Sequence, residues 1–185
     1  MRWCLSTLLV LAPVSLLAVP SPASSQAAQP SGCTAPEFRA LDFLVGHWRV
    51  VHTATGKLMG QNLVEWTDLG CAVKESLTFP GQGVGSSINF YAATDRRWHG
   101  AYHDSIGLFA IFEGTVENSR HIVSANVRFP QDPAHVQKVR QTSFRGQAGR
   151  PQQNGERWDE AKNSWEQIYD VTLCPLQKAE SAPCA

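Results

Sequence analysis

Glu75 is a carboxylic acid in a segment whose pattern predicts a β-strand. Polar and apolar residues alternate over residues 71–79, so Glu75 falls on the same face as Val73 and Leu77, which predicts that it points into the interior. A buried carboxylate must be paired, hydrogen-bonded or protonated. Glu75 could therefore hold backbone groups or an arginine such as Arg140, orient a bound ligand, or act as a general acid or base.

Asp104 is the second carboxylic acid that the pattern predicts to point into the interior. Residues 96–104 also alternate, and the face that carries Trp98 and Tyr102 carries Asp104 as well. A structural role is the simplest expectation for both acids, and a ligand-orienting role is the functional hypothesis. A mostly apolar pocket with a few converging polar groups is typical of small-molecule sites.

Two further segments supply the remaining candidates. In residues 164–173, alternation places Trp165, Gln167 and Tyr169 on one face, whereas the inner face of residues 86–92 stays ambiguous. The candidate ligand-binding residues are Glu75, Asn89, Tyr91, Trp98, Tyr102, Asp104, Trp165 and Tyr169.

Motifs for metals and cofactors are weak. His99 and His103 would point the same way from a strand, but they fall on the face opposite Trp98, which predicts a solvent-exposed pair. His121 is predicted inside, where a histidine can hold haem iron, yet one such position does not support a haem site. No two cysteines have the C-x2–4-C spacing of a zinc site. We predict no metal and no cofactor.

The N-terminal 27 residues predict export. Arg2 supplies a positive charge, an apolar stretch covers residues 5–19, and residues 25–27 have the small-x-small form that signal peptidase accepts. Prolines interrupt the apolar stretch, which disfavours a membrane anchor of roughly 20 residues. The sequence therefore predicts a signal peptide over residues 1–27 and a periplasmic or secreted protein.

Four cysteines follow the predicted signal peptide, and an even number in an exported protein indicates disulfides. Four cysteines allow three pairings, and spacing alone does not choose among them. We expect Cys33–Cys71 and Cys174–Cys184, because each pair would tie a terminus to a nearby part of the chain.

The chain of 185 residues is 43% hydrophobic and has a formal net charge of zero. This composition fits one soluble domain and lacks the basic excess of a nucleic-acid-binding protein. We predict a flexible lead-in at residues 28–34, one domain at residues 35–176, and a polar tail at residues 177–185.

Short alternating segments separated by turn residues dominate this domain, which is typical of all-β proteins. Residues 36–45 are the exception, because their apolar residues have the spacing of a short helix or turn. Strands are expected at residues 47–53, 58–68, 71–79, 86–92, 96–104, 108–116, 120–128, 137–145, 152–159 and 164–173. An antiparallel up-and-down sheet of about 8–10 strands avoids exposed edges by closing into a barrel, whose interior can hold one small ligand.

The start of the first expected strand carries a Gly-x-Trp at residues 46–48, directly after the helical turn. This opening resembles that of the lipocalin and calycin barrels. Further spaced motifs are similar to those of a family of secreted bacterial proteins of unknown function. These motifs are Cys33, residues 43–48, the Gly-Cys-x-x-x-Glu at residues 70–75, and residues 85–107. The resemblance covers residues 33–114 and implies a lipocalin-like barrel, but no reaction or ligand.

The predicted function is an exported β-barrel that holds a small apolar or amphipathic molecule in its interior. Such a protein has no nucleic-acid partner and no membrane span once the signal peptide is removed. One alternative is a barrel enzyme that uses Glu75 or Asp104 as general acid or base, which we favour less. The other is a filled barrel with a structural or interaction role and no ligand. No pattern in the sequence indicates an oligomeric state.

Overall fold

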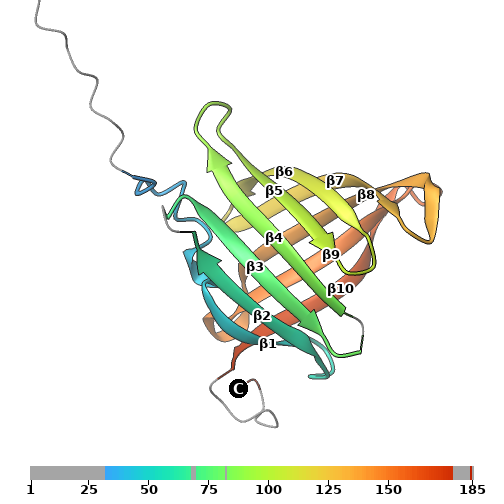
Figure 1. The fold of residues 1–185 in the computed structure, drawn as a ribbon, viewed down its shortest axis with the longest axis horizontal. Coiled ribbons are helices and arrows are strands. Elements are labelled where there is room, and N and C mark those ends of the chain that lie inside the picture. The colour runs from blue at the N-terminus through green and yellow to red at the C-terminus, as the bar shows by residue number, and fades with distance from the viewer. Residues whose placement is uncertain (1–31, 68–69, 82, 177–183, 185) are drawn as a thin grey trace, which may run out of the picture.

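The computed structural model describes residues 32–67, 70–81, 83–176 and 184. Ten antiparallel strands follow one another around a closed barrel, in which the last strand pairs with the first (Figure 1). The strands are β1 (Gly46–His52), β2 (Leu58–Trp66), β3 (Ala72–Phe79), β4 (Gly83–Ala92), β5 (Arg97–Asp104), β6 (Phe109–Glu117), β7 (Arg120–Phe129), β8 (Asp132–Arg145), β9 (Pro151–Asp159) and β10 (Ser164–Pro175). The predicted fold class, an all-β up-and-down barrel, is confirmed.

Each of the ten expected segments is a strand, and two of them, β4 and β8, start three or more residues earlier than expected. β8 begins at Asp132, because Phe129 already pairs with Asp132 across a tight turn. β4 begins at Gly83, because Gly83 pairs with Phe79 at the end of β3. Both starts lie in glycine- or proline-containing stretches that we expected to be loops. Turn residues therefore locate a hairpin more reliably than they locate the strand ends beside it.

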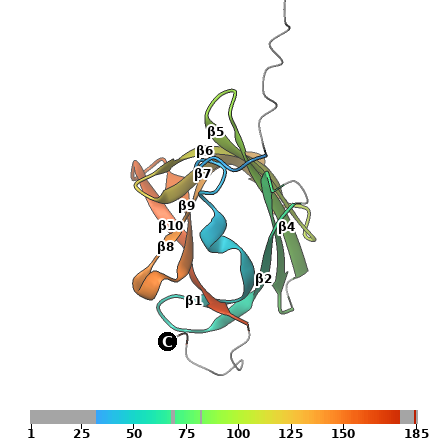
Figure 2. The ribbon, with the colours of Figure 1, turned by 90° about the vertical axis from the view of Figure 1, so that its left-hand side faces the viewer.

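A short N-terminal segment, residues 35–44, lies inside one end of the barrel, and we call it the N-terminal plug (Figure 2). It consists of turns followed by the 3-10 helix η1 (Asp42–Leu44), in agreement with the expected helix or turn. Leu41 and Leu44 are each 1% exposed. The Trp48 indole N–H donates a 2.7 Å hydrogen bond to the Leu44 carbonyl, which joins the plug to β1.

The main hydrophobic core surrounds the plug. Its members alternate along the strands so that they share the inner face of the barrel. The buried residues of this core are Leu41, Leu44, Val50, Val64, Val73, Trp98, Val123, Val171 and Leu173. We call this end of the interior the closed half, because the plug and the core side chains fill it.

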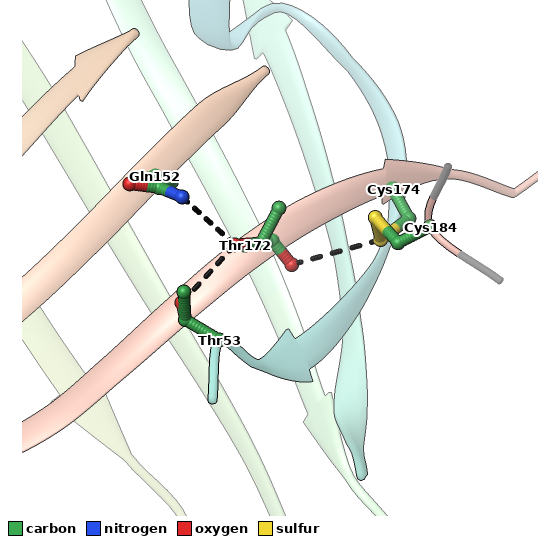
Figure 3. The surroundings of a disulfide bond; sticks show 5 residues. All are labelled: Thr53, Gln152, Thr172, Cys174 and Cys184. Atoms are coloured by element: carbon green, nitrogen blue, oxygen red, sulfur yellow. Dashed lines mark hydrogen bonds between the residues drawn. A yellow bond between two sulfur atoms is a disulfide. The ribbon is translucent and has the colours of Figure 1, made fainter. Parts of the chain in front are cut away.

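Two disulfides tie the ends of the domain to the barrel, and both are the expected pairs. Cys33 is joined to Cys71 just before β3, and Cys174 on β10 is joined to Cys184. Figure 3 shows the second disulfide beside the backbone carbonyl oxygen of Thr172, which lies 4.0 Å from Cys174 Sγ. The Thr172 hydroxyl accepts a 3.2 Å hydrogen bond from Gln152 Nε2. The disulfides therefore attach Cys33 and Cys184, which lie outside the strands, to the barrel.

Several domain predictions concern residues outside the described part of the chain. These are the signal peptide at residues 1–27, most of the lead-in at residues 28–34 and most of the tail at residues 177–185. Within the described ranges, no helix has the length and apolar character needed to cross a membrane.

Candidate functional site in the barrel interior

A layer of polar side chains crosses the middle of the barrel interior, next to the closed half. These residues come from β2, β3, β4, β8 and β9, and their strand registers place them on the inner face. We call this set the polar layer, and it consists of Asn62, Glu75, Ser87, Asn89, Ser143 and Gln153.

Glu75 is the centre of the polar layer and is only 4% exposed. Its carboxylate accepts a 2.7 Å hydrogen bond from Asn62 Nδ2 and a 3.2 Å hydrogen bond from the Ser87 hydroxyl. Two longer contacts of 3.5 Å come from Asn89 Nδ2 and Gln153 Nε2. Four neutral donors thus solvate a buried carboxylate in place of water, as a buried charge requires.

Gln153 links the two sides of the barrel. Its Nε2 reaches Glu75 on β3, and the same nitrogen lies 3.4 Å from the Ser143 hydroxyl on β8. Gln153 is 6% exposed and Ser143 is 1% exposed. The polar layer therefore spans the interior from wall to wall, and it separates the closed half from the rest of the barrel.

Tyr169 lies beyond the polar layer, toward the end opposite the plug. Its ring lies flat over Gly155, where a Cβ atom would be only 2.1 Å from the ring. Its hydroxyl donates a 2.9 Å hydrogen bond to Gln141 Oε1. Loss of hydration on burial, followed by the charge of Glu75, raises its pKa, yet 37% of its surface is accessible. A side chain deep in the protein can be accessible in this way only when it lines space that solvent reaches.

Tyr102 lies on β5 in the same end of the interior. Its hydroxyl would be 2.7 Å from a Cβ atom on Gly85, so the glycine leaves the room that this side chain occupies. The hydroxyl donates a 3.2 Å hydrogen bond to Asp104 Oδ2. Loss of hydration, and then the neighbouring Asp104 charge, raise the pKa of Tyr102 to about 12. Both tyrosines therefore remain neutral hydrogen-bonding groups at physiological pH.

A second, smaller hydrophobic cluster forms the wall beside Tyr102: Ala110, Ala125, Val127 and Val139 are buried there, and Tyr102 packs against them. Ala110 and Ala125 face inward from β6 and β7, and Ala110 lies directly opposite Tyr102 in the register. We call this end the open half of the interior, defined by Leu77, Gly85, Tyr102, Gln141, Gly155 and Tyr169. The side chains of this cluster are smaller than those of Trp98, Leu41 and Leu44, which fill the closed half.

The structure brings four of the eight candidate residues together. Glu75 and Asn89 are in the polar layer, and Tyr102 and Tyr169 are in the open half. Asp104 stands at the edge of this group, where its Oδ1 accepts hydrogen bonds from the backbone N–H groups of Ile106 and Leu108. Its main contacts therefore hold the turn between β5 and β6, the structural role expected for it.

Tyr91 and Trp98 face inward but lie in the closed half. Tyr91 contacts the ring of Phe38 edge-on, with 5.2 Å between centroids. Trp98 is 2% exposed and packs against the His121 ring at 5.1 Å. The strand that carries Tyr91 was ambiguous in sequence, and its register puts Ser87, Asn89 and Tyr91 inside. Both aromatic rings are core residues rather than walls of the open half.

The prediction that Trp165 shares a face with Tyr169 is wrong. The register between β9 and β10 shifts between Gln167 and Tyr169, so one extra residue of β10 is left without an opposite partner. Such a β-bulge reverses the faces on one side of it. Trp165 therefore lies on the outer face, where its ring contacts Trp158 and the guanidinium of Arg140.

Four polar residues of the interior were not predicted from the sequence, namely Asn62, Gln141, Ser143 and Gln153. Asn62 could have been found, because it alternates with Gly60 and Val64 along β2. The strand that carries Gln153 has few apolar residues to reveal its inner face, so only its pairing with neighbouring strands identifies it.

His121 is inside the barrel, as predicted, and is 3% exposed. Its Nε2 has no hydrogen-bond partner among the described residues. Burial lowers its pKa from 6.5 to about 4. Between these values the unfolded chain binds a proton that the folded protein does not, so stability should fall by about 3 kcal/mol as the pH drops from 7 to 4.

Chemical denaturation of wild type and His121→Phe between pH 7 and pH 4 measures this loss of stability. The variant should not show the part of the loss that comes from His121. The same substitution at the exposed residue His103 is the control and should leave the wild-type pH dependence intact. Equal pH dependence in wild type and His121→Phe would show that His121 is not held neutral by burial.

A groove of about 660 Å³ lies elsewhere, beside β8, β9 and β10, and neither tyrosine lines it. Three of its charged residues form ion pairs: Arg157 Nη2 is 3.1 Å from Glu166, and Asp159 is 3.0 Å from Lys162 Nζ.

The polar layer and the open half can orient a small molecule through neutral donors and acceptors. Across the described ranges, no group of three or more histidine, cysteine, aspartate or glutamate side chains could hold a metal ion. No protein-family model matches the chain, and no curated protein matches it either.

Proposed function

We propose that this protein binds a small amphipathic molecule in the open half of its barrel. The observation that carries the proposal is Tyr169, which faces inward from β10 and is nevertheless 37% exposed. The rings of Tyr102 and Tyr169 and the side chain of Leu77 would contact the apolar part of the ligand. Gln141 and Ser87 would meet its polar groups, a mixture typical of small-molecule pockets.

In this proposal Glu75 organises the site without touching the ligand. Its two carboxylate oxygens are occupied by four donors and it is 4% exposed. It therefore fixes the orientation of Ser87, which lies opposite Tyr102 in the register and next to the open half. The same saturation disfavours the alternative in which Glu75 serves as a general acid or base, because a proton-transfer group must reach its substrate.

We also propose that the protein acts outside the cytoplasm, in the periplasm or after secretion. The two disulfides support this proposal, since such bonds persist mainly in oxidising compartments. Kinship with the secreted lipocalin-like family is likewise a proposal. It is supported by Gly46 and Trp48, which start β1 directly after the plug, as the resemblance implies.

Two tryptophan substitutions at neighbouring positions of β3 test the binding proposal. Leu77 faces the open half, and Thr78 is exposed on the outer face. Wild type should bind the neutral amphipathic dye N-phenyl-1-naphthylamine saturably, with one molecule per chain. Leu77→Trp should weaken this binding by about tenfold or more, a loss of about 1.4 kcal/mol or more, because the indole fills the space.

Thr78→Trp is the matched control, because it adds the same ring to the same strand on the other side of the wall. It should bind the dye as wild type does. Equal weakening in both variants, or equal binding in Leu77→Trp and wild type, would place the dye outside the barrel interior and overturn the proposal.

A further inference from the structure

A second groove, of about 480 Å³, lies at the other end of the barrel, between the N-terminal plug and the strands beside it. It is lined by the plug and by the turn between β6 and β7, together with the end of β8. The residues used below are Phe43, Asn118, Ser119, Arg120, Phe144 and Arg145. Leu77, Tyr102 and Tyr169 do not line it, so it is separate from the open half.

Three arginines surround this groove, and two of them lack an acidic partner. Arg39 forms an ion pair with Asp42, with 2.7 Å between Nη2 and Oδ1. In the described part of the chain, no carboxylate forms an ion pair with Arg120 or Arg145. The groove therefore carries uncompensated positive charge, although the formal net charge of the chain is zero.

Phenylalanine rings hold both of these guanidinium groups in place. The Arg120 Cζ atom lies 3.8 Å from the Phe144 ring centroid, and the Arg145 Cζ atom lies 5.3 Å from the Phe43 ring centroid. Stacking occupies the face of a guanidinium and leaves its N–H groups at the edge available to an acceptor. One N–H of Arg145 donates to the Gly149 carbonyl at 3.2 Å, which further fixes its position.

The β6–β7 turn adds neutral donors to the same groove. Asn118 and Ser119 both have positive φ, 50° and 60°, which is the backbone of a tight two-residue hairpin turn. The turn carries the Asn118 amide and the Ser119 hydroxyl on the groove wall beside Arg120. Two oriented guanidinium groups with an amide and a hydroxyl form a donor set that suits an oxyanion.

We propose that this groove binds the oxyanion group of a small molecule, a phosphate or a carboxylate, between Arg120 and Arg145. The arginines donate charge-assisted hydrogen bonds, and the turn residues Asn118 and Ser119 add neutral ones. This anion site is independent of the site proposed in the open half, since the two lie at opposite ends of the barrel.

Calorimetric titration with inorganic phosphate and with succinate, at an ionic strength held constant with sodium chloride, tests this proposal. We expect saturable binding of at least one of the two anions to wild type, and the preferred anion identifies the ligand class. Arg120→Gln and Arg145→Gln should each weaken that binding by about tenfold, because each variant lacks the charged hydrogen-bond donors of one guanidinium group.

Arg128→Gln is the matched control, because Arg128 is an exposed arginine at the far end of the same strand as Arg120. It should bind the anion as wild type does, and so should Leu77→Trp, which fills the open half only. The proposal is overturned if neither anion binds saturably, or if Arg128→Gln weakens binding as much as Arg120→Gln. The Arg145→Gln variant decides the question independently if Arg120→Gln does not fold.

Discussion

Replacing Trp98 with alanine is expected to lower the free energy of unfolding by about 4 kcal/mol. Trp98 is 2% exposed and belongs to the core around the N-terminal plug. Its ring packs against His121 at 5.1 Å and Tyr91 at 6.0 Å. The strands on both sides of β5 are hydrogen-bonded to it, so the wall cannot move inward to fill the space that the indole leaves.

Urea denaturation of the two proteins measures this loss, and Trp165→Ala is the control. Trp165 is a tryptophan of similar size on the outer face, beyond the bulge, and its removal should cost about 1 kcal/mol. Trp98→Ala should also keep its affinity for N-phenyl-1-naphthylamine, because its cavity lies in the closed half. Equal losses of stability in the two variants would contradict the assignment of Trp98 to the main core.

Glu75→Ala is expected to cost a similar amount, about 4 kcal/mol, for a different reason. The substitution removes an acceptor and leaves the buried donors of Asn62 and Ser87 without a partner. An unsatisfied buried donor costs about 1–3 kcal/mol, and the two closest donors account for most of the expected loss. The polar layer should lose its order with the carboxylate, so dye binding should weaken as well.

Denaturation of Glu75→Ala beside Glu65→Ala tests this role. Glu65 is an exposed glutamate on the neighbouring strand β2, and its loss should change stability by no more than about 0.5 kcal/mol. If Glu75→Ala is as stable as wild type but no longer binds the dye, Glu75 contacts the ligand directly and the organising role is wrong.

The sequence was sufficient to predict the barrel and its ten strands. Hydrophobic alternation has a period of two, and Gly56, Gly70 and the Pro130–Pro133 stretch mark the turns, so each strand could be located from local residues. The disulfide pairs were also correct, since chain proximity favours them.

The candidate site was predictable only in part, because its geometry depends on pairing between distant strands. Alternation correctly placed Glu75 inside, but the bulge between Gln167 and Tyr169 moved Trp165 to the outer face without a signal in the local sequence. The contact between Gln153 and Glu75 joins residues 78 positions apart. The difference between an open and a closed half depends on where the plug lies, which no strand pattern specifies.

The most direct measurement is an NMR spectrum of the protein with ¹³C-labelled tyrosine rings, recorded with and without N-phenyl-1-naphthylamine. The chain has three tyrosines: Tyr102 and Tyr169 line the open half, and Tyr91 packs in the closed half. If the open half holds the ligand, the dye should shift the signals of Tyr102 and Tyr169 and leave that of Tyr91 unchanged. Unchanged signals of Tyr102 and Tyr169 at saturating dye would contradict binding inside the barrel.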